Sequence, residues 1–373
     1  MNILYLILGF VLLGLLSFSN ISIKKYIFLS IAFLAIFAYN FDPIYVYNRY
    51  NHYTDLVRIF EDVDSFRVMG YEYYGYMSAP LSRLYISFFG IFFSDNNILV
   101  FTTVVIIYLT NLYILYRIGK DNKCDNNSIL FSMFLFIGMF NYLSAVVNIR
   151  YPIVISIFFM ILYFDLVLNR KLVKIVYFLL ILMHPGSIIF FIIRLITRTR
   201  LKYSLIFIVL SFSLLNFFMD KIFIYIINSG FYFFTDLQLK FLMYTDMSNF
   251  DEATYSYFII NIIKLIYVAM LIHDIKKYLS KDWIYKYKKY VNFSILTSII
   301  SVLCILINNY QLLIRISDIL IMYICVFSML VLNQIKKQNK RLFLLKYISM
   351  WIVLFIYLIF YFGQTYGYNL FIS

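Results

Sequence analysis

The sequence predicts an all-α protein, a polytopic bundle of transmembrane helices with about 12 crossings. Two observations support this fold class: the composition of the chain, and the regular return of long apolar runs. Hydrophobic residues make up 64% of the 373 residues and charged residues 13%, whereas a soluble domain has about 45–50% and about 25%. So much apolar surface requires lipid as a second solvent. We therefore expect a single integral membrane domain over residues 1–373.

The expected spans are apolar runs of helix-spanning or near-spanning length. The first run lacks a basic n-region and a small-residue cleavage site, so we interpret it as a retained helix rather than a signal peptide. A shorter run at 81–93 follows Pro80 and is expected to lie at the interface or to enter the membrane without crossing it. The longer runs lie at residues 2–18, 26–40, 98–116, 129–147, 153–168, 203–218, 257–272, 291–308, 314–332 and 345–362.

Two further short runs, 172–183 and 187–196, flank the tripeptide His184-Pro185-Gly186. Proline lacks the backbone N–H and clashes with the preceding turn, so a helix break is expected here. A single span would place the two flanking clusters of basic residues on opposite sides of the membrane. A hairpin of two short crossings with His184 at its apex places both clusters on the inner side, as the positive-inside rule favours.

The distribution of charge sets the expected sidedness. Both termini face outward, most of the 32 basic residues lie inside, and most of the 18 acidic residues lie outside. The net charge of +14 is then explained by the membrane topology, and no nucleic-acid partner is needed to explain it. The outer side has two sizeable loops, 41–97 and 219–256. Because irregular chain gathers on this face, we expect the protein to work there.

Two candidate site residues lie at the outer ends of expected helices. Arg150, in NIRYP, opens a span. It either snorkels to lipid headgroups or clamps an anion, because a guanidinium offers bidentate donors to phosphate. His184 is either incidental to a Pro-Gly turn or part of a site. In the second case, backbone N–H groups near Ser187, at the start of the next half-helix, would add partial positive charge.

Arg315 and Asp318 lie in NNYQLLIRISD, at positions i and i+3 of an expected helix. This spacing places both on one helical face. They form either an intrahelical ion pair, or a second phosphate-binding arginine that Asp318 orients.

The segment FDPIYVYNRYNHYTDLVRIF, residues 41–60, mixes aromatic, amide, acidic and basic side chains just after the second span. Such a mixture suits carbohydrate binding, and an interfacial tyrosine belt has much the same composition. Tyr47, Arg49 and His52 are its candidate substrate-binding residues. Asp42 and Asp55 are the candidate carboxylates for a general base. Three other arginines are interpreted as interfacial or solvated charges, namely Arg58, Arg67 and Arg83.

The sequence contains no P-loop, GxGxxG or HExxH motif, and no Asp-rich motif that would hold a metal-bound nucleotide sugar. The three cysteines have no zinc-site spacing. We therefore expect neither a metal nor a cofactor. Within the spans lies Lys264, with Asp165 and Asp318 nearer the ends. A series of intramembrane carboxylates for ion coupling is missing, which disfavours a secondary transporter.

Four segments, taken in order, resemble the EpsG/Wzy group of polysaccharide polymerases. They are the outer FDPIYVYNRYNHY, the arginine-opened NIRYPIVISIFFMILYF, the histidine-ended VYFLLILMHPGSIIFF and the late LLIRISDILIMY. Their order and spacing cover roughly residues 40–330. The sequence departs from the group's pattern after His184, where Pro185 and Gly186 precede Ser187.

The resemblance implies a membrane glycosyltransferase with a GT-C-like fold in the bacterial inner membrane. Such enzymes join polyprenyl-diphosphate-linked oligosaccharide repeats of an O-antigen, capsule or exopolysaccharide on the periplasmic or exterior face. It implies Arg150 and Arg315 as the groups that stabilise the diphosphate, His184 as an aid to phosphate or acceptor, and Asp42 or Asp55 as the base. The implied partners are the lipid-linked repeat, membrane lipids and a chain-length regulator.

Three other functions stay open at this point. An O-antigen ligase uses the same class of chemistry with a lipid A-core acceptor, and it usually shows one dominant late outer loop. A flippase for the lipid-linked repeat would line its spans with charges from both halves of the chain. A membrane acyltransferase would need a catalytic histidine in an inward-accessible tunnel.

Overall fold

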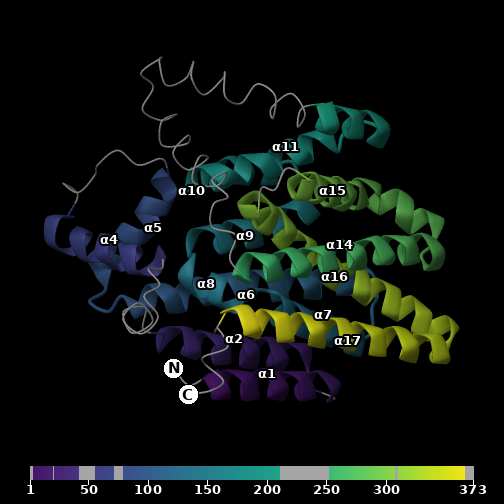
Figure 1. The fold of residues 1–373 in the computed structure, drawn as a ribbon, viewed down its shortest axis with the longest axis horizontal. Coiled ribbons are helices and arrows are strands. Elements are labelled where there is room, and N and C mark those ends of the chain that lie inside the picture. The colour runs from purple at the N-terminus through teal and green to yellow at the C-terminus, as the bar shows by residue number, and fades with distance from the viewer. Residues whose placement is uncertain are drawn as a thin grey trace. The chain divides into compact units, whose positions relative to one another are not determined.

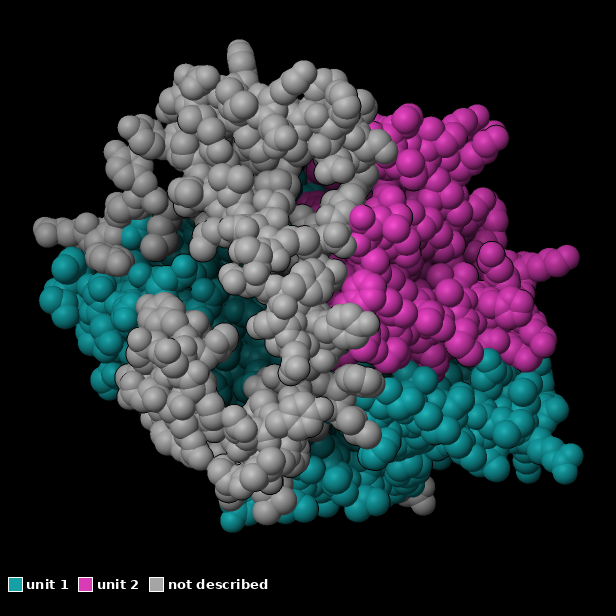
Figure 2. All heavy atoms as spheres, in the orientation of Figure 1, with its two compact units in different colours: residues 1–188, 325–358 teal, residues 189–324, 359–373 magenta. Residues whose placement is uncertain are grey.

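The computed structural model describes residues 3–19, 21–41, 55–70, 79–210, 252–306 and 310–365. Every regular element in these ranges is a helix, as Figure 1 shows, which confirms the all-α prediction for the part of the chain described. The chain forms two compact units, coloured separately in Figure 2. Unit 1 comprises residues 1–188 and 325–358, and unit 2 comprises residues 189–324 and 359–373. The single membrane domain over residues 1–373 stays a prediction.

Unit 1 is built on four apolar helices from the first 139 residues of the chain. These are α1 (Ile3–Phe18), α2 (Ile23–Tyr39), α6 (Asn97–Asp121) and α7 (Asn126–Met139). Helix α2 packs on α6, and α1 packs on α7. The side chain of Ser22 caps α2 by accepting the N–H of Lys25 at 3.4 Å. A Cβ atom on Gly14 would lie 2.9 Å from the ring of Phe134, so glycine permits the close approach of α1 to α7.

The expected span 129–147 is interrupted, which corrects the prediction of one continuous helix. Helix α7 ends at Met139, and a short helix α8 (Tyr142–Val147) follows. The side chain of Asn141 accepts the N–H of Ser144 at 2.7 Å and so begins α8 as an N-cap. Helix α9 (Arg150–Leu166) then starts directly after Asn148 and Ile149. Apolar periodicity alone did not reveal the cap, because the flanking residues are apolar on both sides.

Within the expected outer loop 41–97, the described residues form two helices that pack against each other, α4 (Asp55–Met69) and α5 (Pro80–Phe92) (Figure 1). Proline is tolerated in the first turn of α5, since its missing N–H would have no helical partner there. A Cβ atom on Gly90 would lie 2.7 Å from the carbonyl oxygen of Val63, so the crossing of α4 and α5 requires glycine. The expected short run 81–93 is thus a helix, and its partner α4 was not expected.

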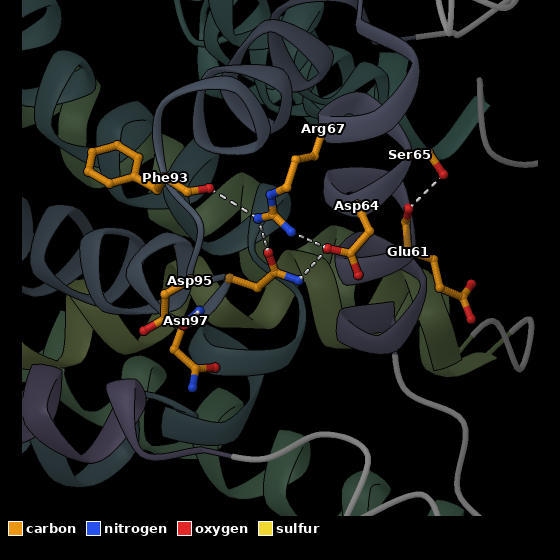
Figure 3. Close-up of polar contacts among 8 residues, drawn as sticks. Glu61, Asp64, Ser65, Arg67, Phe93, Asp95 and Asn97 are labelled. Carbon is orange, nitrogen blue, oxygen red and sulfur yellow. Dashed lines mark hydrogen bonds and ion pairs between the residues drawn. The ribbon is translucent and has the colours of Figure 1, made fainter.

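Polar bonds tie α4 to the segment between α5 and α6 (Figure 3). Arg67 of α4 pairs with Asp64 and donates to the carbonyl oxygen of Phe93 at 3.0 Å and to Oδ1 of Asn96 at 2.7 Å. Asn96 in turn donates to Asp64 at 3.1 Å. Because these bonds join α4 to the start of α6, they hold the α4–α5 pair to the other helices of unit 1.

Helix α10 (Val173–Met183) packs on both α9 and α5 in unit 1. Asp165, the last residue but one of α9, accepts the hydroxyl of Tyr177 in α10 at 3.3 Å. The later part of the chain returns to unit 1 with the second half of α16 (Tyr310–Gln338) and most of α17 (Lys340–Thr365). Ser132 of α7 donates to the carbonyl oxygen of Cys325 in α16 at 2.9 Å.

Unit 2 contains most of α11 (Ile188–Ile196), together with α14 (Glu252–Tyr278), α15 (Lys281–Leu306) and the first half of α16. Helices α14 and α15 pack against each other. The ring of Tyr290 in α15 lies 4.7 Å from that of Tyr323 in α16, measured between centroids.

Several described helices are long and apolar enough to cross a membrane. By length and composition there are 5 of them: Asn97–Asp121, Phe258–Tyr278, Lys281–Leu306, Leu312–Gln338 and Lys340–Leu358. Shorter apolar helices occur at Tyr5–Phe18, Pro80–Phe92, Asn126–Met139, Val173–Met183, Pro185–Ile196 and Leu201–Leu210. The multi-pass character is therefore confirmed. The figure of about 12 crossings and the GT-C-like arrangement stay predictions.

Candidate functional site

Arg150 is the first residue of α9 and is half-buried. The chain turns sharply just before it, because α8 ends at Val147 and its C-cap Asn148 donates its N–H to the carbonyl oxygen of Ser144 at 2.9 Å. The next N–H, that of Tyr151, bonds to the carbonyl oxygen of Asn148 at 3.1 Å. The break between α8 and α9 thus places the guanidinium at a helix start, where the partial positive charge of the helix also favours an anion.

His184 ends α10, which confirms the predicted break at His184-Pro185-Gly186. Its backbone is extended, with φ −148° and ψ 104°, and a short 3-10 turn, η2 (Pro185–Ser187), follows before α11. The ring atom Nδ1 accepts the N–H of Gly186 at 3.2 Å, and the carbonyl oxygen accepts the N–H of Ser187 at 2.9 Å. The N–H groups of Gly186 and Ser187 are therefore both hydrogen-bonded within the turn.

This hydrogen bond also fixes how the imidazole is used. Since Nδ1 of His184 is the acceptor for Gly186, the neutral ring carries its proton on Nε2. The Nε2–H is then the atom with which the ring donates to a neighbouring group. The turn therefore gives the two ring nitrogens different roles: Nδ1 accepts a hydrogen bond and Nε2 is a donor.

The structure brings Arg150 and His184 to the same end of one helix pair. Helices α9 and α10 pack against each other, and the ring of Tyr151 meets the ring of His184 edge-on, with 5.6 Å between centroids and 76° between planes. Tyr151 directly follows Arg150. The start of α9 and the end of α10 therefore form one polar end of unit 1, with a guanidinium and an imidazole on it.

The structure places Asp55 in the first turn of α4, on the surface. Its carboxylate pairs with Arg58 at 3.0 Å, and the two side chains are 48% and 50% exposed. Such a pair contributes little to stability and is largely solvated, so the interpretation of Arg58 as a solvated charge agrees with it. The other candidates of this segment, Asp42, Tyr47, Arg49 and His52, lie outside the described residues.

Arg83 is a correction to the interpretation as a solvated charge, since it is buried. Its side chain is 4% exposed, and its guanidinium carbon lies 5.3 Å from the centroid of the Phe66 ring in α4. It shares the buried face of α5 with Ile86 and Gly90. The signal was present in the sequence, because these three positions recur at i, i+3 and i+7 of a helix. Arg67 is also bonded rather than simply solvated, as described above.

In unit 2, Arg315 lies half-buried in the second turn of α16. The expected interaction partner of Asp318 was Arg315, but the ion pair of Asp318 in the described residues is formed with Lys264 of α14, at 3.5 Å between Nζ and Oδ1. Lys264 was noticed in the sequence only as a charge within a span. Its pairing with Asp318 joins residues of two separate helices, which a sequence pattern does not reveal.

The fold and these residues define a class: a multi-pass α-helical membrane protein with an arginine and a histidine at the ends of two packed helices. The sequence model of one protein family, described as the EpsG family, matches residues 27–372. The chain belongs to the EpsG family, a Wzy-like family of polysaccharide polymerases, which confirms the resemblance found in the sequence. No curated protein and no solved structure matches the chain.

Proposed function

We propose that the protein is a polysaccharide polymerase that joins polyprenyl-diphosphate-linked oligosaccharide repeats. The growing chain on one lipid diphosphate is transferred to a sugar hydroxyl of another lipid-linked repeat. The hydroxyl oxygen forms a bond to the anomeric carbon, the bond from that carbon to the diphosphate oxygen breaks, and the hydroxyl proton passes to a base. The observation that carries the proposal is the family match over residues 27–372, supported by the cationic end of the α9–α10 pair.

The leaving group explains why cationic residues are needed. Negative charge grows on the diphosphate as the bond to the anomeric carbon breaks, so donors placed in advance lower the barrier. Arg150 offers two parallel N–H donors to phosphate oxygens, and His184 offers its Nε2–H beside Tyr151. The energy of the reaction resides in the donor, so no further energy source is required.

Arg315 is proposed as a second residue that binds the diphosphate. Arg315 lies on helix α16 in unit 2. The ion pair of Asp318 with Lys264 holds this part of α16 to α14. The base is proposed among Asp42 and Asp55. Tyr47, Arg49 and His52 are proposed to bind the sugar portion.

The proposed setting is the bacterial inner membrane, with the reaction on its periplasmic or exterior face. The charge distribution supports this setting, since the positive-inside rule predicts that most basic residues lie on the opposite face. The product is an O-antigen, a capsule or an exopolysaccharide, and membrane lipids and a chain-length regulator are the proposed partners. O-antigen ligation shares this chemistry and differs in its acceptor, a lipid A-core.

A flippase for the lipid-linked repeat is a second candidate, favoured by one observation. The Lys264–Asp318 ion pair is buried between two long apolar helices, and intramembrane charges are typical of transport pathways.

A deletion strain separates these functions by its surface and lipid-linked saccharides, resolved on gels. Loss of a polymerase leaves single repeats exposed on the outer face and removes the ladder of longer chains. Loss of a flippase leaves single lipid-linked repeats on the inner face. Loss of a ligase leaves long chains on the polyprenyl lipid, unattached to the lipid A-core. Either of the last two results would contradict the proposed function.

A further inference from the structure

Four polar side chains meet in the buried space between α14 and α16. Asn261 and Lys264 come from α14, and Ser317 and Asp318 come from α16. All four belong to unit 2. Their exposed fractions are 2%, 4%, 0% and 9%, so the protein rather than water must satisfy them.

Their bonds form one connected group, which we call the α14–α16 lock (Asn261, Lys264, Ser317 and Asp318). The ammonium of Lys264 lies 3.5 Å from Oδ1 of Asp318 and donates to Oγ of Ser317 at 3.3 Å. The hydroxyl of Ser317 lies 2.6 Å from Oδ1 of Asn261 and 2.9 Å from the carbonyl oxygen of Ile314, and it donates its one proton to either acceptor.

Stability alone does not explain a charge pair at this place. A lysine or an aspartate within a membrane-spanning helix is costly, because its charge is removed from water. Replacing a buried ion pair by apolar side chains of similar volume is often neutral or stabilising. An ion pair that also forms hydrogen bonds specifies a geometry, because all of its bonds form in only one arrangement of the two helices.

The lock holds two consecutive residues of α16. Consecutive residues of a helix point about 100° apart, so bonds at Ser317 and Asp318 together restrict the rotation of α16 about its axis. Arg315 lies three residues before Asp318, about 60° away from it on the helix surface. Whatever fixes the rotation of this turn also fixes the direction in which Arg315 leaves the helix.

We propose that Lys264 and Asp318 are positioning residues that hold α16 in the rotation at which Arg315 meets the diphosphate. The role of Arg315 rests on the proposed function. Lys264 and Asp318 themselves do not touch the substrate. They act by orienting the guanidinium of Arg315. A small displacement of this group lowers the reaction rate, because its N–H donors must meet the charge that develops on the diphosphate.

The first test compares two double variants of the full chain, purified in lipid nanodiscs with a synthetic lipid-linked repeat as substrate. Lys264→Met with Asp318→Leu removes the directed bonds and keeps the volume. Lys336→Met with Asp125→Leu is the matched control, since it removes the interhelical ion pair between α16 and the start of α7, at 2.6 Å. The lock variant is expected to keep its yield and melting temperature, to lose kcat about tenfold or more, and to keep its KM. The control keeps its kcat.

The second test reads the rotation without using activity. Asn261→Cys with Ser317→Cys places two thiols at facing positions of α14 and α16, where the native side-chain oxygens lie 2.6 Å apart. Oxidation is expected to join them, as mass spectrometry of the linked peptides would show. Adding Lys264→Met and Asp318→Leu is expected to reduce the yield of this crosslink at least severalfold.

The outcomes separate the two claims. A well-folded lock variant with wild-type kcat, or an unchanged crosslink yield, overturns the positioning role. If the wild-type chain makes no polymer while the crosslink still depends on Lys264 and Asp318, the proposed function fails and the fixed rotation of α16 is supported.

Discussion

At the scale of residues, the described part of the site depends on a small number of local bonds. The Nδ1 of His184 is engaged by Gly186, and the ring contacts Tyr151 beside Arg150. The sequence predicted the helix break, because proline and glycine punctuate an apolar run. It did not predict the burial of Arg83 or the Lys264–Asp318 pair. Those depend on which faces pack together, which composition and charge do not specify.

The first prediction concerns the planar fork of Arg150. Arg150→Lys keeps the positive charge and loses the bidentate donors, so polymer formation is expected to fall about ten- to hundredfold. Arg58→Lys is the control, because Arg58 makes a half-exposed surface pair and is expected to keep its activity. Initial rates on a lipid-linked repeat measure both. Equal rates for Arg150→Lys and wild type, at equal membrane insertion, would return Arg150 to the role of a lipid-facing anchor.

The second prediction separates the two nitrogen atoms of His184. In His184→Asn the amide oxygen takes the place of Nδ1 and can still accept the N–H of Gly186, but the donor at Nε2 is lost. In His184→Gln the amide nitrogen lies near the position of Nε2 and can donate. If the histidine acts on substrate, Gln retains more activity than Asn. The reverse order, with normal activity in His184→Asn, would show that His184 serves only the turn.

At the scale of elements, helix boundaries follow from caps that apolar periodicity conceals. Asn141 divides the expected span 129–147 by accepting the N–H of Ser144, whereas Pro80 was recognisable as a helix start. Another such boundary lies between α6 and α7, where Asp125 pairs with Lys336 of α16 at 2.6 Å and accepts the hydroxyl of Ser128. The ion pair connects the boundary between α6 and α7 to α16, all within unit 1. Its contribution to stability can be tested by changing the pH.

The third prediction uses the titration of Asp125. Partial burial would raise its pKa, but hydrogen bonds from Lys336 and Ser128 hold the pKa below the ordinary value of a carboxyl. A group with a lowered folded-state pKa stabilises the fold above its unfolded pKa, about 3.9, and this stabilisation is lost as pH falls through the folded pKa. Asp125→Asn is therefore expected to melt below wild type at pH 7, and the difference is expected to shrink below about pH 4.

Melting temperatures of both proteins in detergent across this pH range provide the measurement. Asp55→Asn serves as the control, because Asp55 forms a half-exposed pair and is expected to change melting little at any pH. A difference between Asp125→Asn and wild type that stays constant down to pH 3 would contradict the assignment of the stabilisation to this ion pair.

At the scale of the whole molecule, composition and charge were sufficient for the class of protein. An apolar chain with its charges gathered between apolar runs predicts a multi-pass helical protein, and the helices of the described residues agree. The number of crossings depends on short helices such as α5, α7, α10 and α11, whose lengths of 13, 14, 11 and 9 residues fall below a full span. Helix length alone does not decide whether these four helices cross the membrane, so the sidedness of the chain must be measured.

The fourth prediction tests that sidedness with two matched cysteines. Val68→Cys in α4 is expected on the outer face and Tyr285→Cys in α15 on the inner face, and both native side chains are 83% exposed. The three native cysteines are buried, and burial raises the pKa of the Cys124 thiol to about 12, so they contribute little background. In intact spheroplasts an impermeant maleimide is expected to label Val68→Cys alone, and both variants after lysis. Labelling of Tyr285→Cys in intact cells would contradict the predicted topology.

The central claim is polymerisation at the expense of a lipid diphosphate, and the most direct measurement is reconstitution. The purified chain in nanodiscs would receive a synthetic polyprenyl-diphosphate oligosaccharide repeat, with the slower Arg150→Lys variant assayed beside it. The account predicts a ladder of saccharides that differ by one repeat, with one polyprenyl diphosphate released for each linkage formed. Protein that is folded, inserted and supplied with substrate, yet releases no polyprenyl diphosphate and leaves every saccharide at one repeat, would contradict it.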